Sequence, residues 1–349
     1  MERRYKRSLR SITRMSTYQP QNILVTGGAG FIGSHFVDHM LQSDKTIQVI
    51  NLDALTYAGK MENLELSIND PRHHFVHGNI CDKELVSKLF AQYSIDTVVH
   101  FAAESHVDRS ILRPEIFVKT NIEGTQCLLE VARKVWLEQN QWDREQCRFH
   151  MISTDEVFGS LQLDEPAFTE KSSYQPNSPY AASKAGADHL VRAYNHTYKL
   201  PVTISNCSNN YGPRQDNEKL IPTVIQACFQ QKAIPVYGNG LNRRDWIHVI
   251  DHCRMVDWVI RNGVIGDSYN LGADCERTNI EVIQWICASM DELLPQEKPH
   301  AELIRFVHDR AGHDFRYAIN SNKALKEGCV KPIYDFKNTL KQMIKSRIA

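Results

Sequence analysis

The sequence of 349 residues balances 41 lysines and arginines against 41 aspartates and glutamates, and hydrophobic residues make up 42% of it. This length allows one large domain or two modest ones with a well-buried core, and the balanced charge gives no bulk attraction to nucleic acid. No apolar stretch approaches the roughly 18 residues of a membrane-spanning helix. Nine cysteines occur singly, without a C-x-x-C pair, which favours reduced thiols and predicts a cytoplasmic protein with no nucleic-acid or membrane partner.

The chain begins with a basic segment, MERRYKRSLRSITR, that lacks the apolar region of a secretory signal. A transit-like peptide is one interpretation of this segment. We predict instead that residues 1–20 form a basic, disordered tail outside the folded domains.

A glycine-rich turn follows the first predicted strand, NILVT. Its glycines are Gly27, Gly28, Gly30 and Gly33. This spacing fits the G-x-G-x-x-G pattern, in which glycines permit a tight turn and bring backbone N–H groups at a helix N-terminus close to a pyrophosphate. Asp53 ends the second predicted strand about 20 residues later, where a carboxylate accepts hydrogen bonds from a ribose diol and repels a 2′-phosphate. The sequence therefore predicts an NAD site.

Strands and helical patterns alternate along the first 205 residues. The predicted strands are NILVT, QVINLD, HHFVHGNI, DTVVHFAA, RFHMIST and PVTISNCS. This alternation predicts an α/β fold, a Rossmann-type doubly wound parallel sheet with a smaller mixed α/β substrate-binding lobe. We assign residues 21–205 to the NAD-binding domain, with a return segment near 243–270, and residues 206–242 and 271–349 to the lobe. The segment SYNLG is assigned to the lobe, and the polar stretch WLEQNQWDREQC to the surface.

Two groups of residues carry the predicted chemistry. Tyr180 and Lys184 are spaced i, i+4 on an amphipathic helix, so both side chains lie on one face. A nearby ammonium and a bound nicotinamide cation both lower a phenol pKa, which suits Tyr180 to accept a proton from a sugar hydroxyl. Thr154, Asp155 and Glu156 follow the fifth strand, at the edge where such folds keep their active sites. Two adjacent carboxylates suit a reaction that needs one acid and one base.

Two further groups leave alternatives open. His100, Glu104, His106 and Asp108 could be taken for a metal cluster, but their spacing matches no compact zinc site, and we predict no metal and a loop against cofactor and substrate. Several cationic side chains of the later loops could clamp a diphosphate. These are Lys219, Arg243, Arg244, Arg310 and His313.

A set of short motifs extends from about residue 21 to about residue 320. They are TGGAGFIGSH, LTYAG, HFAAESHVDRS, TNIEGT, STDEVFG, SPYAASKA, SNCSNNYGP, EKLIP, RDW and DRAGHD. Together they closely resemble nucleoside-diphosphoglucose 4,6-dehydratases, above all the dTDP-glucose 4,6-dehydratases of rhamnose-type deoxysugar pathways, within the extended short-chain dehydrogenase/reductases. The run STDEV is the most telling, because 4-epimerases of the same superfamily lack its acid pair.

The resemblance implies a redox-neutral reaction in three steps. Tyr180, helped by Thr154 and Lys184, removes the proton of the C4 hydroxyl while hydride passes to NAD. Glu156 then removes the C5 proton that the new 4-ketone has acidified, and Asp155 protonates the departing C6 hydroxyl. Hydride returns to C6, which gives a 4-keto-6-deoxy sugar nucleotide and water. The resemblance also implies a homodimer formed through helices beside the sheet.

The resemblance also assigns binding residues. The cofactor set is Gly27, Gly30, Phe31, Ile32, Gly33, Asp53, Ala54, Leu55, Thr56, Asn79, Ile80, Phe101, Ala102, Ala103, Ser105, Thr120, Tyr180, Lys184 and Asn210. The substrate set is Ser105, Thr154, Asn209, Lys219, Leu220, Pro235, Val236, Tyr237, Arg244, Asn279, Asp309, Arg310, Ala311, Gly312 and His313.

The chain departs from the family pattern in a few places. Asn79 stands where the family typically has Asp, Phe158 replaces a Tyr, and Ala311 replaces a loop Pro. Alternative functions are an NAD-dependent nucleotide-sugar 4-epimerase, a non-catalytic NAD-binding regulatory protein and a plain NAD-linked alcohol dehydrogenase. Thymidine and uridine differ by one methyl group, so the residues leave the choice between dTDP and UDP open.

Overall fold

The computed structural model describes residues 17–309 and 311–348. Its centre is a seven-stranded sheet of order β10-β6-β5-β4-β1-β2-β3, in which every neighbouring pair is parallel. The strands are β1 (Asn22–Thr26), β2 (Gln48–Asp53), β3 (His73–His77), β4 (Thr97–His100), β5 (Arg148–Thr154), β6 (Val202–Cys207) and β10 (Ser268–Leu271). The order reverses between β4 and β2, on either side of β1, and this reversal opens a crevice at the carboxyl ends of the strands.

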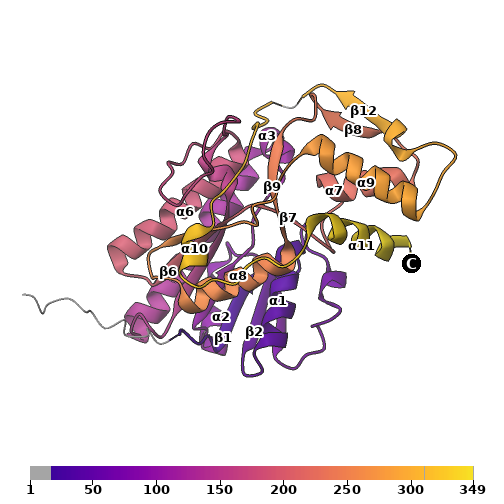
Figure 1. The fold of residues 1–349 in the computed structure, drawn as a ribbon. Helices are drawn as coiled ribbons and strands as arrows, with labels where there is room; N and C mark the ends of the chain where they lie inside the picture. The colour runs from indigo at the N-terminus through magenta and orange to yellow at the C-terminus, as the bar shows by residue number, and fades with distance from the viewer. Residues whose placement is uncertain (1–16, 310, 349) are drawn as a thin grey trace, which may run out of the picture.

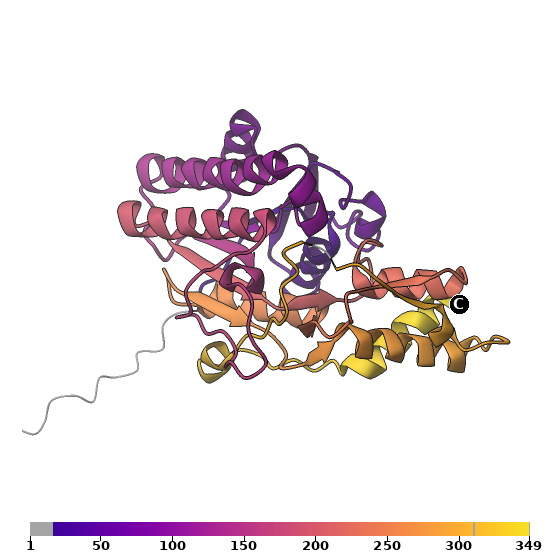
Figure 2. The ribbon, with the colours of Figure 1, turned by 90° about the horizontal axis from the view of Figure 1, so that it is seen from above.

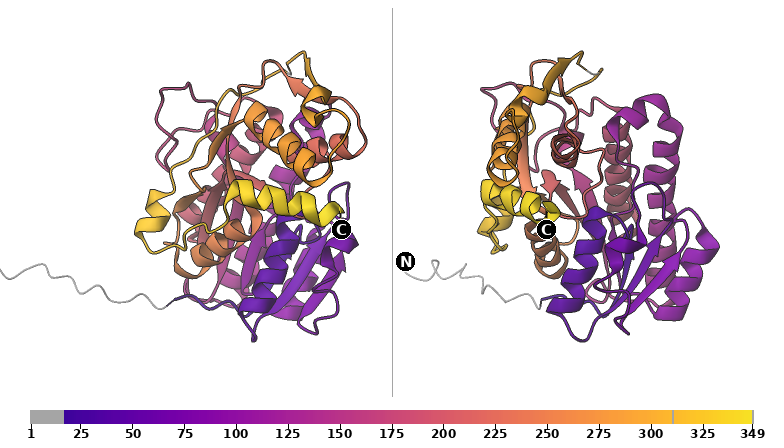
Figure 3. Two further views of the ribbon diagram at one scale, coloured as in Figure 1. Left: turned by 45° about the vertical axis from the view of Figure 1, so that its right-hand side comes forward. Right: turned by 90° about the vertical axis from the view of Figure 1, so that its right-hand side faces the viewer.

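Successive residues of the strands pack alternately into two hydrophobic cores, one on each face of the sheet. Ile23 and Val25 of β1 pack with helices α1 (Phe31–Ser43) and α8 (Val249–Asn262), whereas Leu24 packs on the opposite face. That face is covered by α2 (Lys83–Tyr93), α5 (Gly124–Ala132) and α6 (Pro179–Tyr198). Helices therefore lie on both sides of the sheet, and α5 and α6 run side by side (Figures 2 and 3). The predicted α/β doubly wound fold is confirmed.

The second lobe lies above the central sheet in Figure 1. It contains a three-stranded sheet, β11-β9-β7, and a parallel pair, β12-β8. The strands are β7 (Asn209–Tyr211), β8 (Ile234–Tyr237), β9 (Arg243–His248), β11 (Glu276–Thr278) and β12 (Ile304–Val307). Helices α7 (Leu220–Phe229), α9 (Asn279–Leu293) and α11 (Phe336–Ile348) pack around a core of their own. A capping box between Thr278 and Glu281 starts α9.

The remaining helical segments are short. They are η1 (Met61–Leu64), α3 (Val107–Leu112), α4 (Pro114–Phe117), η2 (Val118–Glu123), η3 (Arg133–Gln139), η4 (Asp155–Phe158), η5 (His300–Leu303) and α10 (Asn322–Lys326). No helix in the described ranges is long and apolar enough to cross a membrane.

Two placements differ from the sequence prediction. The segment SYNLG was assigned to the lobe, but Ser268–Leu271 forms β10, which pairs with β6 as the edge strand of the central sheet. The stretch WLEQNQWDREQC was assigned to the surface, but Trp136 is fully buried, and its indole N–H donates to the Ile95 carbonyl at 2.7 Å. The prediction missed Trp136 because most of the residues that follow it in this stretch are polar.

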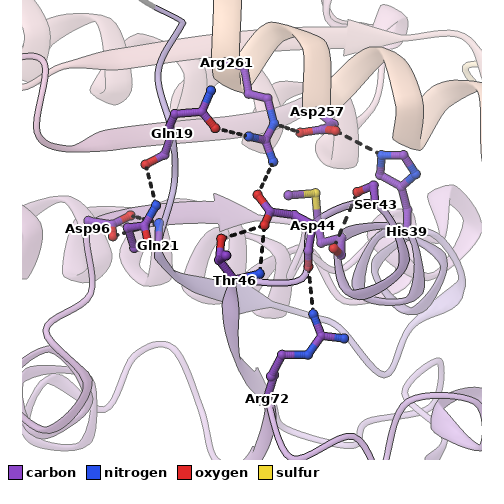
Figure 4. A network of polar contacts seen from close by, with 11 residues as sticks. Gln19, Gln21, His39, Ser43, Asp44, Thr46, Arg72, Asp96, Asp257 and Arg261 are labelled. Atoms are coloured by element: carbon purple, nitrogen blue, oxygen red, sulfur yellow. Dashed lines mark hydrogen bonds and ion pairs between the residues drawn. The ribbon is translucent and has the colours of Figure 1, made fainter.

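The segment before β1 is attached to the sheet. The backbone N–H of Tyr18 donates to the Arg261 carbonyl at 2.9 Å, and its buried hydroxyl lies 2.8 Å from Thr97 Oγ1. Arg261 also bonds the side chains of Gln19, Asp44 and Asp257, at 2.8, 3.2 and 2.7 Å (Figure 4). Residues 18 and 19, which were assigned to the predicted tail, are therefore attached to the folded domain, whereas residues 1–16 of that prediction lie outside the described residues.

Candidate active site

A cleft opens at the carboxyl ends of the central strands, where it is lined by the glycine turn, the ends of β2, β4 and β5 and the start of α6. It brings together nearly all of the predicted cofactor residues. Those that line it are Gly27, Gly30, Phe31, Ile32, Gly33, Asp53, Ala54, Thr56, Asn79, Ile80, Phe101, Ala102, Ala103, Ser105, Thr120, Tyr180, Lys184 and Asn210. Leu55, the remaining member of that set, has a positive φ of 48° and is not among the lining residues.

The glycine turn requires glycine for two different reasons. Gly27 has φ +74°, and a Cβ there would lie 2.6 Å from the Ala102 backbone nitrogen. At Gly33 a Cβ would lie only 2.2 Å from the Gly27 carbonyl oxygen, because the first turn of α1 packs directly on the loop. Gly30 caps α1 without a side-chain hydrogen bond, which leaves the N–H groups of the helix start to an external anion. These features fit the pyrophosphate of a dinucleotide.

Asp53 is held rigidly at the end of β2. Its Oδ2 accepts from the Ala29 N–H at 2.9 Å, and its Oδ1 accepts from the Leu55 N–H at 2.8 Å. Gly59 passes so close that a Cβ would lie 2.6 Å from Asp53 Oδ1. A carboxylate oxygen accepts more than one hydrogen bond, so the backbone contacts orient the group and leave acceptor capacity for a ribose diol.

The acid pair lies directly after β5. Asp155 is buried and its Oδ1 accepts from the Thr154 hydroxyl at 3.3 Å, whereas its buried Oδ2 has no hydrogen-bond partner in the described part of the chain. Burial raises the pKa of Asp155 well above its ordinary value, and the carboxylates of Glu156 and Asp245 add to this effect, while Arg244 opposes it. Burial therefore favours the protonated form of Asp155, which can donate a proton. Glu156, half-buried on the same turn, donates its backbone N–H to Thr154 Oγ1 at 3.3 Å.

Tyr180 and Lys184 reach the same cleft from the first turns of α6. Ser178 caps this helix by accepting from the Ala181 N–H at 3.1 Å, and Pro179 follows it. Burial and then the Glu156 carboxylate raise the pKa of Tyr180 well above 10, while its hydrogen bond with Thr154 acts in the opposite direction.

Lys184 donates from Nζ to the Ile152 carbonyl at 2.8 Å, and burial lowers the pKa of its ammonium. In the chain alone the pKa of Tyr180 is thus raised, by burial and then by Glu156. The predicted lowering concerns the site with a bound nicotinamide cation and stays a prediction.

The predicted substrate residues fall into two groups. Ser105, Thr154, Asn209 and Lys219 line the cleft. The other described members are Leu220, Pro235, Val236, Tyr237, Arg244, Asn279, Asp309, Ala311, Gly312 and His313, which belong to the second lobe and its loops and do not line the cleft. Arg310 lies outside the described residues.

Part of this second group does come together. His313 Nδ1 lies 2.6 Å from Asp309 Oδ1, and the edge of the Tyr237 ring faces the His313 ring with centroids 6.1 Å apart. Arg244 is buried, lies over the Tyr317 ring at 4.3 Å and donates to the Asp314 carbonyl at 3.0 Å. Because Arg244 also acts on the pKa of Asp155, this part of the lobe extends toward the acid pair.

Several cleft residues were not in the predicted sets. Tyr57, Glu104, Ser208, Gln215, Asp216 and Glu218 all line it. Arg109 lies 3.9 Å over the Tyr57 ring and pairs with Glu218, and Lys219 donates to the Ser105 carbonyl at 3.1 Å. Three loops thus meet at the rim of the cleft. Four of these residues lie in the motifs LTYAG, HFAAESHVDRS, SNCSNNYGP and EKLIP, and that was the available signal.

Among the described residues, no group of three or more His, Cys, Asp or Glu side chains is arranged to hold a metal ion. His100, which the metal alternative required, instead lies between Thr26 Oγ1 at 2.7 Å and Thr125 Oγ1 at 2.9 Å. Glu104 lines the cleft, as the loop interpretation expects.

Comparison with known proteins identifies the family. The family model described as GDP-mannose 4,6 dehydratase matches residues 24–343. The dTDP-glucose 4,6-dehydratase of Neisseria gonorrhoeae is 50% identical over 335 residues, which cover 95% of this chain and 96% of that protein. The chain belongs to the dTDP-glucose 4,6-dehydratase family.

Solved structures agree with this assignment. DesIV, a dTDP-glucose 4,6-dehydratase from Streptomyces venezuelae solved with NAD and TYD bound, has a TM-score of 0.85 and 42% identity, and the match covers 93% of this chain and 96% of that chain. A UDP-glucose 4-epimerase from Thermotoga maritima has a TM-score of 0.81 but only 26% identity, with 94% and 99% covered. The fold is shared with epimerases, whereas the sequence favours the dehydratase. The resemblance predicted from the motifs is confirmed.

One departure from the dehydratase pattern has a structural account. Phe158, which replaces the usual Tyr, is buried against Phe168 and Tyr174, with ring centroids 5.2 Å from each. A hydroxyl at this position would need a partner inside an apolar cluster.

Proposed function

We propose that Thr154, Asp155, Glu156, Tyr180 and Lys184 carry out the 4,6-dehydration of dTDP-glucose in this chain. The enzyme is an NAD-dependent hydro-lyase of the dTDP-glucose 4,6-dehydratase family. The single observation that supports these roles is that all five residues line the cleft that the glycine turn also lines. They lie at the end of β5, in η4 and in the first turns of α6.

The environments of the two carboxyls support different roles. Buried Asp155 holds its proton and so acts as the acid that protonates the departing C6 hydroxyl, which leaves as water. Half-buried Glu156 acts as the base that takes the proton from C5. Tyr180, hydrogen-bonded to Thr154, takes the proton of the C4 hydroxyl. NAD, when bound, supplies the hydride acceptor for C4 and the hydride donor for C6.

The order of these steps follows from carbon acidity. The C5–H bond becomes acidic only after C4 is a ketone, so oxidation precedes the action of Glu156. Loss of the C5 proton and of the C6 hydroxyl together form a C5=C6 double bond conjugated with the ketone. Hydride addition at C6 and proton return at C5 complete a 4-keto-6-deoxy sugar. Because the hydride removed from C4 is the one returned to C6, the cofactor has to stay bound throughout.

The remaining predicted residues take binding roles in this proposal. Residues 21–205, with α8 and β10 of the return segment 243–270, hold the cofactor. Residues 206–242 and 271–349, together with β9, hold the nucleotide part of the substrate. His313 contacts both Tyr237 and Asp309. The Tyr237 ring suits stacking on the base, and a His313 side chain held by Asp309 suits the diphosphate. Asn79 lines the cleft, and in this proposal its amide oxygen accepts a hydrogen bond from the amino group of the adenine.

We also propose a cytoplasmic homodimer. Helices α3 and η2 pack beside α6 and carry three exposed apolar side chains, Ile111, Leu112 and Val118, of which Leu112 is 80% exposed. Burying this apolar surface in a symmetric interface would favour a dimer. Light scattering of the parent and of Leu112→Glu tests this, and equal dimer content in both would contradict the proposed face. The nine cysteines are all free thiols, as suits a reducing compartment.

Product analysis tests the proposed reaction. The enzyme is incubated with NAD and either dTDP-glucose or UDP-glucose, and products are identified by mass spectrometry. We expect loss of one water to a 4-keto-6-deoxy product, without net NADH. Formation of a galactose epimer would support the 4-epimerase, accumulation of NADH would support the alcohol dehydrogenase, and tight NAD binding with no turnover of any sugar nucleotide would support the regulatory protein.

A further inference from the structure

One buried carboxylate attaches the second lobe to the start of α6. Asp314 follows His313, a proposed substrate residue, and is only 6% exposed. Its Oδ1 accepts from the side-chain amide of Asn177 at 2.7 Å. Asn177 directly precedes Ser178, the N-cap of α6. The loop before Asp314 passes the same point, because a Cβ on Gly312 would lie 3.3 Å from the Asn177 carbonyl oxygen.

The same residue also holds Arg244 within the lobe. Asp314 Oδ2 accepts from the Tyr317 hydroxyl at 2.5 Å, and the Arg244 guanidinium lies over the Tyr317 ring, 4.3 Å from its centroid. The backbone carbonyl of Asp314 accepts from Arg244 at 3.0 Å and from the side-chain amide of Asn242 at 3.2 Å. Asp314 therefore connects the β9 residue that is proposed to bind substrate with the segment that begins α6.

A sugar nucleotide has to extend across this junction. In the proposed function its nucleotide part is held by the second lobe, whereas its hexose lies beside Tyr180 on the first turn of α6. Tyr180 is three residues beyond Asn177, so the hydrogen bond between Asn177 and Asp314 fixes the separation of the two parts of the site. Reactions between bound groups are sensitive to misplacements of about 1 Å. This hydrogen bond should therefore matter more for the chemistry on the hexose than for the binding of the nucleotide.

We propose that Asp314 is a positioning residue for the reaction, which through Asn177 holds the second lobe in register with the helix that carries Tyr180. This inference rests on the proposed function, because it assumes that the lobe binds the nucleotide and that Tyr180 acts on the hexose. Asp314 touches neither substrate nor cofactor in this account. It acts through the placement of His313 and Arg244 relative to α6.

Reversal of the hydrogen-bonded pair tests this proposal. Asn177→Asp places two carboxylates against each other at about pH 8, where both are ionised, and because Asn177 is exposed the change should leave the fold intact. We expect kcat/KM for dTDP-glucose to fall by about 10-fold or more, while the inhibition constant of dTDP, which lacks the hexose, and the NAD content change by less than about twofold. Adding Asp314→Asn to this variant again places an amide against a carboxylate and still leaves an acceptor for the Tyr317 hydroxyl. The double variant should recover most of the lost kcat/KM.

Asn195→Asp is the matched control. It makes the same substitution near the other end of α6 and removes a hydrogen bond of similar length, from the Asn195 amide to the Leu200 carbonyl at 2.8 Å. Its kcat/KM should equal that of the parent, because this hydrogen bond does not join the two lobes.

A purely structural role of the loop predicts a different result, in which the affinity for dTDP falls by the same factor as kcat/KM. That outcome would overturn the inference, as would parental kcat/KM in Asn177→Asp or a double variant no more active than Asn177→Asp. Should Asn177→Asp not be recovered folded, Asn177→Ala, which only removes the donor, decides alone. An unchanged kcat/KM in that variant overturns the proposal. Failure of the parent enzyme to dehydrate any sugar nucleotide would instead refute the proposed function.

Discussion

Gly33→Ala is the sharpest single test of the cofactor loop. The added Cβ would lie 2.2 Å from the Gly27 carbonyl oxygen and 2.9 Å from both the Gly27 carbonyl carbon and the Gly28 Cα. All three are backbone atoms, so no flexible side-chain end can move aside. Restoring an ordinary separation of 3.4 Å requires a displacement of about 1.2 Å between the loop and the start of α1.

That displacement falls on the part of the loop that should bind the pyrophosphate. An N–H···O bond of about 2.9 Å that lengthens by 1 Å is no longer a hydrogen bond. Loss of one or two charge-assisted bonds weakens NAD binding by about 2–4 kcal/mol, roughly 30- to 700-fold. We therefore expect Gly33→Ala to be purified largely without cofactor and to regain activity only in high added NAD.

The assay is the NAD content of the purified protein, followed by titration calorimetry with NAD. Gly186→Ala on α6 is the matched control, because its added Cβ would meet only the Ile122 Cδ1 end at 3.1 Å, which can shift. This control should retain the parent's NAD content. Full occupancy and unchanged NAD affinity in Gly33→Ala would refute the inference that the tight packing of loop on helix shapes the dinucleotide site.

Three further predictions concern the acid pair and the N-terminal segment. Glu156→Gln should lower dehydration by about 10²- to 10⁴-fold while some C4 oxidation continues, seen as NADH absorbance on the enzyme; full turnover would show that the base is elsewhere. Asp155→Asn should abolish turnover yet raise Tm, by about 2–4 °C for each kcal/mol gained, because the raised pKa of Asp155 opposes folding at every pH above the unfolded value of 3.8; a lower Tm near pH 7 would contradict this. Tyr18→Phe removes the hydroxyl bonded to Thr97 and should cost about 1 kcal/mol in urea denaturation, whereas an unchanged midpoint would argue against anchoring of residue 18.

Local patterns in the sequence were enough to predict much of the fold and the residues at the centre of the site. Short apolar runs between helical segments gave the six strands β1–β6, because a strand buried on both faces has to be apolar along its length. The glycine turn and Asp53 were accessible for the same reason, since each depends on residues close in the chain. The strand-end position of Thr154 and the i, i+4 spacing of Tyr180 and Lys184 also follow from local geometry.

Long-range contacts were not accessible in this way. Ser268–Leu271 was assigned to the lobe from its position in the chain, and only the pairing with β6 places it in the central sheet. Tyr18 looked like one more residue of a basic tail, although its hydroxyl reaches Thr97, 79 positions away. In the sequence, Asp188 is one more polar residue of α6. Its side chain is buried because it accepts hydrogen bonds from Ser153 and Tyr174, which lie in other segments of the chain.

For the protonation of Tyr180, the sequence spacing and the structural environment lead to opposite expectations. The i, i+4 relation to Lys184 predicts an acidic phenol, but the spacing says nothing about burial or about Glu156, and both oppose ionisation. In the chain alone, burial favours the protonated forms of both Tyr180 and Asp155. Positive charge entering the cleft favours the phenolate, so in the proposed reaction we expect Tyr180 to act as a base only when NAD is bound. The C4 hydroxyl would then lose its proton only where a hydride acceptor is already in place.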